Sequence, residues 1–132
     1  YQAFYSASKS AINTLTMALA NELAGRKSKE GKPIRAAALM PGDVKTGFTA
    51  ARQKDTAGAE LYPKLESSLG KMEHDEQNGM PPEALAKRAY SISLKKHPKP
   101  LYSCGLMYMF FCVLAKILPC RLVNFILGKM YA

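Results

Sequence analysis

Tyr5 and Lys9 are the residues of this chain whose types and spacing could carry chemistry. Side chains four positions apart on a helix lie one turn apart on the same face, so the lysine ammonium can approach the tyrosine phenol. A nearby positive charge stabilises a phenolate, which is otherwise scarce near neutral pH. A tyrosine placed in this way can act as a general acid or base in alcohol–ketone chemistry. The simpler alternative is a surface tyrosine and lysine that share a helix turn by chance.

A second candidate segment is the run Pro41-Gly42-Asp43-Val44-Lys45-Thr46. It follows a mostly apolar stretch, residues 34–40, that we predict to be a buried parallel strand. Open α/β sheets bind their ligands outside the carboxyl ends of strands, which is where this run would lie. Asp43 either contacts a substrate or stabilises the turn, and the turn role is the simpler interpretation.

The remaining sequence predicts further helices and one more strand around these two segments. The alanine- and leucine-rich residues 3–24 predict a helix that ends near Gly25. Short helices at 48–56 and 60–72 lie in polar surroundings that are typical of a mobile cover. Pro81 and Pro82 open a helix that extends to near residue 96, because proline is favoured at the first turn. A final strand is expected at 101–104, an apolar helix at 106–118 and an amphipathic helix at 121–131.

Composition places the chain among globular proteins and argues against nucleic-acid binding. The chain has 132 residues, of which 48% are hydrophobic, enough for one domain with a modest core. Its net charge is +9, but the Lys and Arg residues form short clusters without interleaved aromatics, so we expect no nucleic-acid binding. A basic surface can favour a dinucleotide phosphate or an anionic membrane, although a solvated surface is the simpler interpretation.

The cysteines and histidines indicate no metal site. Cys104, Cys112 and Cys120 lack metal-type spacing, and their odd number argues against a disulfide framework. A reducing compartment such as the cytoplasm fits this usage. His74 is interpreted as part of a solvated charged loop and His97 as a helix-end residue. We therefore expect that this chain holds no metal.

The two candidate segments together resemble those of the short-chain dehydrogenase/reductase superfamily. The motifs that carry the resemblance are Tyr5-Ser6-Ala7-Ser8-Lys9-Ser10-Ala11 and Pro41-Gly42-x-Val44-x-Thr46. In that family the first motif opens the helix after the fifth strand, and the second follows the sixth strand. Residues 82–86 are similar to the family's next helix, and residues 101–103 to its last strand. The resemblance implies an α/β fold, the C-terminal part of a Rossmann-like, doubly wound parallel sheet.

The resemblance assigns the whole chain, 1–132, to the C-terminal half of a single domain. Residues 1–46 would supply the catalytic helix, a strand and the cofactor loop; 47–100 the substrate cover and a helix; 101–132 the last strand and an apolar tail. The family's glycine-rich turn, Asn-Ala-Gly stretch and catalytic serine have no counterpart here, and the sequence begins at Tyr1. We therefore expect an incomplete domain that is inactive alone, within a parent protein that is an enzyme.

The resemblance also implies a role for each matching residue. Tyr5 would exchange a proton with the substrate oxygen, while Lys9 would stabilise its phenolate and hold the ribose hydroxyls of a nicotinamide cofactor, NAD or NADP. The other cofactor contacts would be backbone groups that line the nicotinamide at Pro41, Gly42 and Val44, and a hydroxyl that meets its carboxamide at Thr46. The implied reaction is a reversible interconversion of an alcohol and a ketone, in which the cofactor carries the hydride.

The tail after residue 105 leaves two interpretations open. Residues 106–118 are too short to span a bilayer, which takes about 20 apolar residues. They either fill a substrate pocket or subunit interface, or lie in a membrane interface with Lys116, Arg121 and Lys129 at the headgroups.

The tail pattern resembles family members that handle retinoids, steroids or acyl lipids, which implies an apolar alcohol or ketone substrate. Small side chains on the helix at 3–24 suit packing in a homodimer or tetramer. The alternative to an enzyme is a non-catalytic truncated domain that associates with a protein or a membrane surface.

Overall fold

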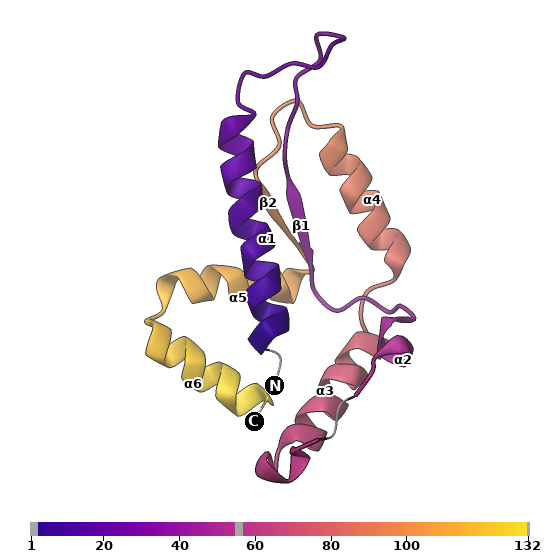
Figure 1. Cartoon of the computed structure of the whole chain (residues 1–132), viewed down its shortest axis with the longest axis vertical. Coiled ribbons are helices and arrows are strands. Elements are labelled where there is room, and N and C mark those ends of the chain that lie inside the picture. Colours follow the sequence, from indigo (N-terminus) through magenta and orange to yellow (C-terminus); the bar gives the residue numbers. More distant parts are fainter. Residues whose placement is uncertain (1–2, 55–56, 132) are drawn as a thin grey trace.

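The computed structural model describes residues 3–54 and 57–131 and has an α/β architecture with one two-stranded parallel sheet. In chain order the elements are α1 (Ala3–Glu22), β1 (Ala38–Pro41), α2 (Phe48–Ala51), the 3-10 helix η1 (Ala59–Leu61), α3 (Leu65–Gln77), α4 (Pro82–Ser93), β2 (Leu101–Cys104), α5 (Leu106–Ile117) and α6 (Cys120–Tyr131). Figure 1 shows α1 and α4 running alongside the two strands, with α2 and α3 beyond the end of β1.

The two strands pair in parallel, with Ala38 opposite Leu101 and Pro41 opposite Cys104. This confirms the predicted parallel strand and brings the carboxyl ends of β1 and β2 to the same edge of the sheet. The prediction of a strand over 34–40 was wrong in extent. β2 begins opposite Ala38, so residues 34–37 have no strand beside them in the described part of the chain. β1 is half-buried rather than buried, because a sheet of two strands leaves part of each side chain in contact with solvent.

Helix α1 matches the predicted helix at 3–24 to within two residues. Its high content of alanine and leucine favours the helical state, and no proline interrupts it. Gly25 follows with φ of 77°, the left-handed conformation that glycine adopts at helix ends without a steric cost.

The two helices predicted over 48–72 differ from the observed ones. α2 ends at Ala51, earlier than predicted, and residue 56, the predicted end, lies outside the described residues. The helix predicted at 60–72 is replaced by η1 and by α3, which starts only at Leu65. Pro63 explains the shift, because a proline disfavours helical geometry in the residue before it. Since α3 continues to Gln77, His74 lies in a helix and not in the predicted loop.

The last three helices lie close to their predicted ranges. α4 starts at Pro82. Proline is favoured at the first position of a helix, because the backbone N–H that it lacks would have no partner within the helix there. α4 ends at Ser93, earlier than the predicted residue 96. Pro119 separates α5 from α6, and Leu118 before it is extended, with φ and ψ of −79° and 146°.

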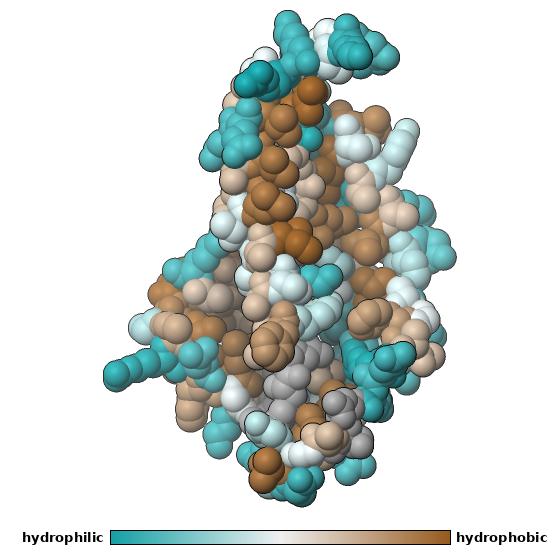
Figure 2. Space-filling model, viewed as in Figure 1, coloured by the Kyte–Doolittle hydropathy of each residue, from teal (hydrophilic) through white to brown (hydrophobic). Residues whose placement is uncertain are grey.

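Very little of the described chain forms a closed core. Ile92 and Tyr102 are its buried apolar residues, with exposed fractions of 7% and 8%. By contrast, α1 exposes Ile12 and Leu15 by 51% and 58%, and Figure 2 shows apolar side chains along the outward face of this helix. An exposed apolar surface of this kind marks a contact with further protein or with lipid.

Candidate active site

A cleft of about 1300 Å³ opens beside the carboxyl end of β1. α1 supplies Tyr5 and Lys9 to its wall, and the end of β1 and the following loop supply Pro41 and Gly42. The cleft therefore brings together four of the six residues to which the sequence assigned a role. The roles themselves stay predictions.

Tyr5 and Lys9 share one face of α1. The Lys9 ammonium nitrogen lies 5.1 Å from the centroid of the Tyr5 ring, within the range of a cation–π contact. The Ser8 hydroxyl donates to the Tyr5 carbonyl oxygen at 2.7 Å, a bond that the helix geometry allows at this spacing. Tyr5 is 49% exposed, so its phenol is open to a ligand in the cleft.

Backbone hydrogen bonds hold the loop after β1 from two sides. The Gly42 N–H donates to the Cys104 carbonyl at the end of β2, at 3.1 Å. On the other side, the Met80 N–H donates to the Asp43 carbonyl at 2.9 Å, and the Lys45 N–H donates to the Met80 carbonyl at 3.0 Å. The loop is thus fixed between β2 and the residues that lead into α4.

Val44 and Thr46 do not line the cleft. Val44 is half-buried and forms an isolated parallel bridge with Met80. The Thr46 hydroxyl oxygen accepts the Phe48 N–H at 3.2 Å, a local turn that threonine side chains commonly form before a helix. The structure therefore places these two predicted cofactor residues beside the cleft wall and not in it.

An ion-pair network joins α2 to α3 and forms another part of the wall. The Arg52 guanidinium, with 14% of its side chain exposed, pairs with Glu76 and lies 3.7 Å from Glu73. Lys54 pairs with Glu73 at 2.7 Å, and the Thr49 hydroxyl donates to Glu76 at 2.7 Å. Sequence reasoning missed this network because it placed the segment around His74 in a solvated loop. The signal was present, since residues three apart share a helix face.

Tyr108, in the first turn of α5, is another site residue that sequence reasoning missed. Its hydroxyl donates a hydrogen bond to the Asp43 carboxylate, and both residues line the cleft. In the sequence Tyr108 lies within an apolar run, and nothing there indicates a partner 65 positions away.

Most other side chains in the cleft wall are apolar. They come from α1, β1, α2, α3 and α6 and include Phe4, Ile12, Leu39, Met40, Phe48, Leu65, Leu69, Met72 and Leu127. The Asn13 amide lies 3.3 Å from the Met40 sulfur, a contact that joins α1 to β1. A wall of this kind favours a ligand with a large apolar part and a few polar groups near Tyr5 and Lys9.

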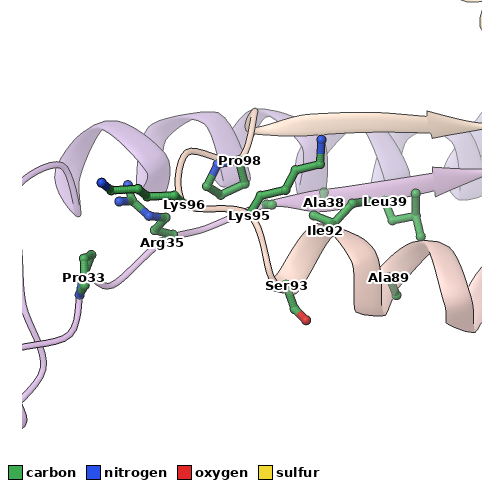
Figure 3. A pocket seen from close by; sticks show the side chains of 11 residues that line it. Pro33, Arg35, Ala38, Leu39, Ala89, Ile92, Ser93, Lys95, Lys96 and Pro98 are labelled. Carbon is green, nitrogen blue, oxygen red and sulfur yellow. The ribbon is translucent and has the colours of Figure 1, made fainter.

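A second pocket, of about 590 Å³, lies between β1 and α4 and holds none of the predicted site residues. Figure 3 shows Ile92 of α4 next to Ala38 and Leu39 of β1, with Arg35 and Lys96 at one end. The basic residues at that end are exposed to solvent. The polar side chains of its lining are Arg35, Ser93, Lys95 and Lys96.

Two comparisons with known proteins found similarities to this chain. The family model for short chain dehydrogenases matches residues 1–57, which include Tyr5, Lys9 and the loop after β1. A 3-ketodihydrosphingosine reductase of Bacteroides thetaiotaomicron is 31% identical over 136 residues, an alignment that covers 100% of this chain and 48% of the relative. The chain therefore spans about half the length of this curated relative. No solved structure matches the chain.

Proposed function

We propose that this chain forms the C-terminal part of a short-chain dehydrogenase/reductase, an NAD(P)-dependent oxidoreductase that interconverts an alcohol and a ketone. The observation that carries the proposal is the pairing of Tyr5 and Lys9 on one face of α1, inside the cleft at the end of β1. The match of residues 1–57 to the family model supports it.

Tyr5 would move the proton in both directions of the reaction. During reduction its phenol donates a proton to the carbonyl oxygen as that oxygen becomes a hydroxyl, and during oxidation its phenolate takes the proton back. The Lys9 ammonium would stabilise the phenolate in both directions, because it lies one turn away on the same face. A bound nicotinamide supplies or accepts the hydride.

The residues present fit the nicotinamide end of such a cofactor. Pro41 and Gly42 bring the loop after β1 to the cleft wall, and Lys9 offers a donor for ribose hydroxyls. At about 1300 Å³ the cleft exceeds the ~300–1,000 Å³ of ordinary small-molecule pockets. The sequence contains no glycine-rich dinucleotide turn, so the 132 residues of this chain supply no such binding site for the pyrophosphate.

We propose an apolar ketone, with its alcohol, as the substrate class. The apolar wall from Phe4 to Met72 supports this, because it could bury a hydrocarbon chain while the reacting oxygen meets Tyr5. The name of the Bacteroides relative, a reductase of 3-ketodihydrosphingosine, also supports a ketone substrate.

An activity assay on the complete protein that contains this chain tests the proposal. Ketones of increasing chain length are supplied with NADH or NADPH, and loss of the reduced nicotinamide absorbance is followed. We expect ketone-dependent oxidation of at least one cofactor, with kcat/KM rising about fourfold per buried CH₂. No ketone-dependent oxidation with either cofactor would contradict the proposal.

We propose a second function for the tail, contact with an anionic membrane surface. α5 and α6 expose large apolar side chains, including Phe110 at 59% and Phe125 at 62%. No Asp or Glu occurs in residues 84–132, so no acidic side chain of that segment offsets the positive charge of the tail. Of the helices in residues 3–54 and 57–131, none has the length and apolar character needed to cross a bilayer. Helices of this kind instead lie in the interface and draw on anionic headgroups.

A further inference from the structure

We infer that Tyr108 is a positioning residue that fixes the loop after β1 in the geometry needed to hold the nicotinamide. The inference rests on the proposed function, since it assigns a task within the same site. Tyr108 stands in the first turn of α5 and lines the cleft together with Asp43, Tyr5 and Lys9.

The Tyr108 ring lies against two glycines at the carboxyl ends of the two strands. Gly42 follows β1 directly and Gly105 follows β2 directly. A Cβ added at Gly42 would run into the Tyr108 ring, and one added at Gly105 would lie 3.0 Å from its Cδ2. The ring therefore occupies space that is available only because position 42 has no side chain. The Tyr108 side chain therefore lies against the residues that directly follow both β1 and β2.

The Tyr108 hydroxyl adds a directed contact to this packing. It donates to the Asp43 carboxylate, and hydrogen bonds to an ionised acceptor are stronger than bonds between neutral groups. The Asp43 carbonyl is already held by the Met80 N–H at 2.9 Å. Tyr108 thus holds the side chain of a residue whose backbone is held by a separate hydrogen bond, which leaves the loop little freedom to turn.

The expected consequence is a loss of cofactor affinity without a matching loss in the chemical step. Tyr108 is not placed to exchange a proton with the substrate, because its hydroxyl is engaged with Asp43. A more mobile loop after β1 would bind the nicotinamide less tightly before the reaction. The KM for the cofactor would therefore rise. Once the cofactor is saturating, kcat depends mainly on Tyr5 and Lys9.

The test uses Tyr108→Phe, which keeps the ring and removes the hydroxyl, and Asp43→Asn, which removes the charge. Both are made singly and together in the complete protein, with Tyr90→Phe as the matched control, because Tyr90 lies on α4 and is 68% exposed. We expect each single variant to raise KM for the cofactor about tenfold while kcat stays within about twofold. The double variant should be no worse than either single one, because both remove the same interaction.

Several results would overturn the inference. One is a KM for Tyr108→Phe within about twofold of the Tyr90→Phe control, and another is a double variant whose effect equals the product of the two single effects. A Tyr108→Phe protein that fails to fold would show that the Tyr108 hydroxyl is needed for folding, and would overturn the positioning role. Failure of the proposed function is separate, because it is read from Tyr5→Phe. If that variant loses turnover while Tyr108→Phe behaves like the control, only the inference about Tyr108 falls.

Discussion

The ammonium nitrogen of Lys9 lies 5.1 Å from the centroid of the Tyr5 ring, one helical turn further along α1. The contact follows from the four-residue spacing alone, because α1 is regular over Ala3–Glu22. It places a fixed positive charge beside the group that would carry the proton.

Removing that charge should slow the reaction. We expect Lys9→Met to lower kcat about 100-fold in the complete protein, because the phenolate of Tyr5 loses its stabilising cation. Lys29→Met is the control, since Lys29 lies on an exposed loop away from the cleft. Steady-state kinetics on both variants checks this. Equal kcat values for the two would contradict the role given to Lys9.

A methyl group at position 42 should destabilise the fold, while one at position 47 should not. Gly42→Ala would push a Cβ into the Tyr108 ring, and overpacking of this kind costs about 1–3 kcal/mol. Gly47→Ala meets nothing within 4 Å and should change the free energy of unfolding by less than about 0.5 kcal/mol. Urea unfolding of the two variants measures the difference. Equal stabilities would show that the ring does not pack on Gly42.

Much of the site's local geometry could be predicted from the sequence. The extent of α1 and the shared face of Tyr5 and Lys9 depend on helix periodicity, and the strand before Pro41 depends on the apolar run that ends in Pro-Gly. These features are decided by residues close together in the chain. Local sequence patterns were therefore enough to predict them.

Other features depend on contacts between distant segments and could not be predicted. The Tyr108–Asp43 bond joins positions 65 apart and exists only because β1 and β2 end at the same edge of the sheet. The position of Thr46 was missed for the opposite reason. Its hydroxyl oxygen accepts a hydrogen bond from Phe48, two residues away, and a family motif gives no sign of that local bond.

The Arg52 network should contribute far more to stability than a surface ion pair. Arg52→Met would leave the half-buried Glu76 without its cation and Glu73 with Lys54 alone, at a cost of about 3 kcal/mol. Lys32→Met, in the exposed pair with Glu30, should cost less than about 1 kcal/mol. Free energies of unfolding in urea, measured on both variants, compare the two. A similar loss in each would mean that the network does not hold α2 on α3.

Membrane contact through the tail should depend on α6 and on lipid charge. We expect the protein to sediment with vesicles that contain phosphatidylserine and much less with pure phosphatidylcholine. Phe125→Glu should lower the partition coefficient about tenfold or more, because a buried aromatic side chain is lost from the interface. Leu94→Glu is the control, because Leu94 is 68% exposed at the end of α4. An equal decrease in the two variants, or no sedimentation of the unaltered protein, would contradict membrane contact by the tail.

The role of Tyr5 as the proton donor and acceptor is tested most directly by Tyr5→Phe in the complete protein, with kcat and cofactor dissociation measured on the same preparation. We expect a fall in kcat of roughly 10²–10⁴-fold, because the ring remains and only the transferable proton is lost. Cofactor affinity should stay within about threefold, since the hydroxyl acts in the chemical step. Turnover that survives the substitution, or cofactor binding that is lost together with turnover, would contradict the role given to Tyr5.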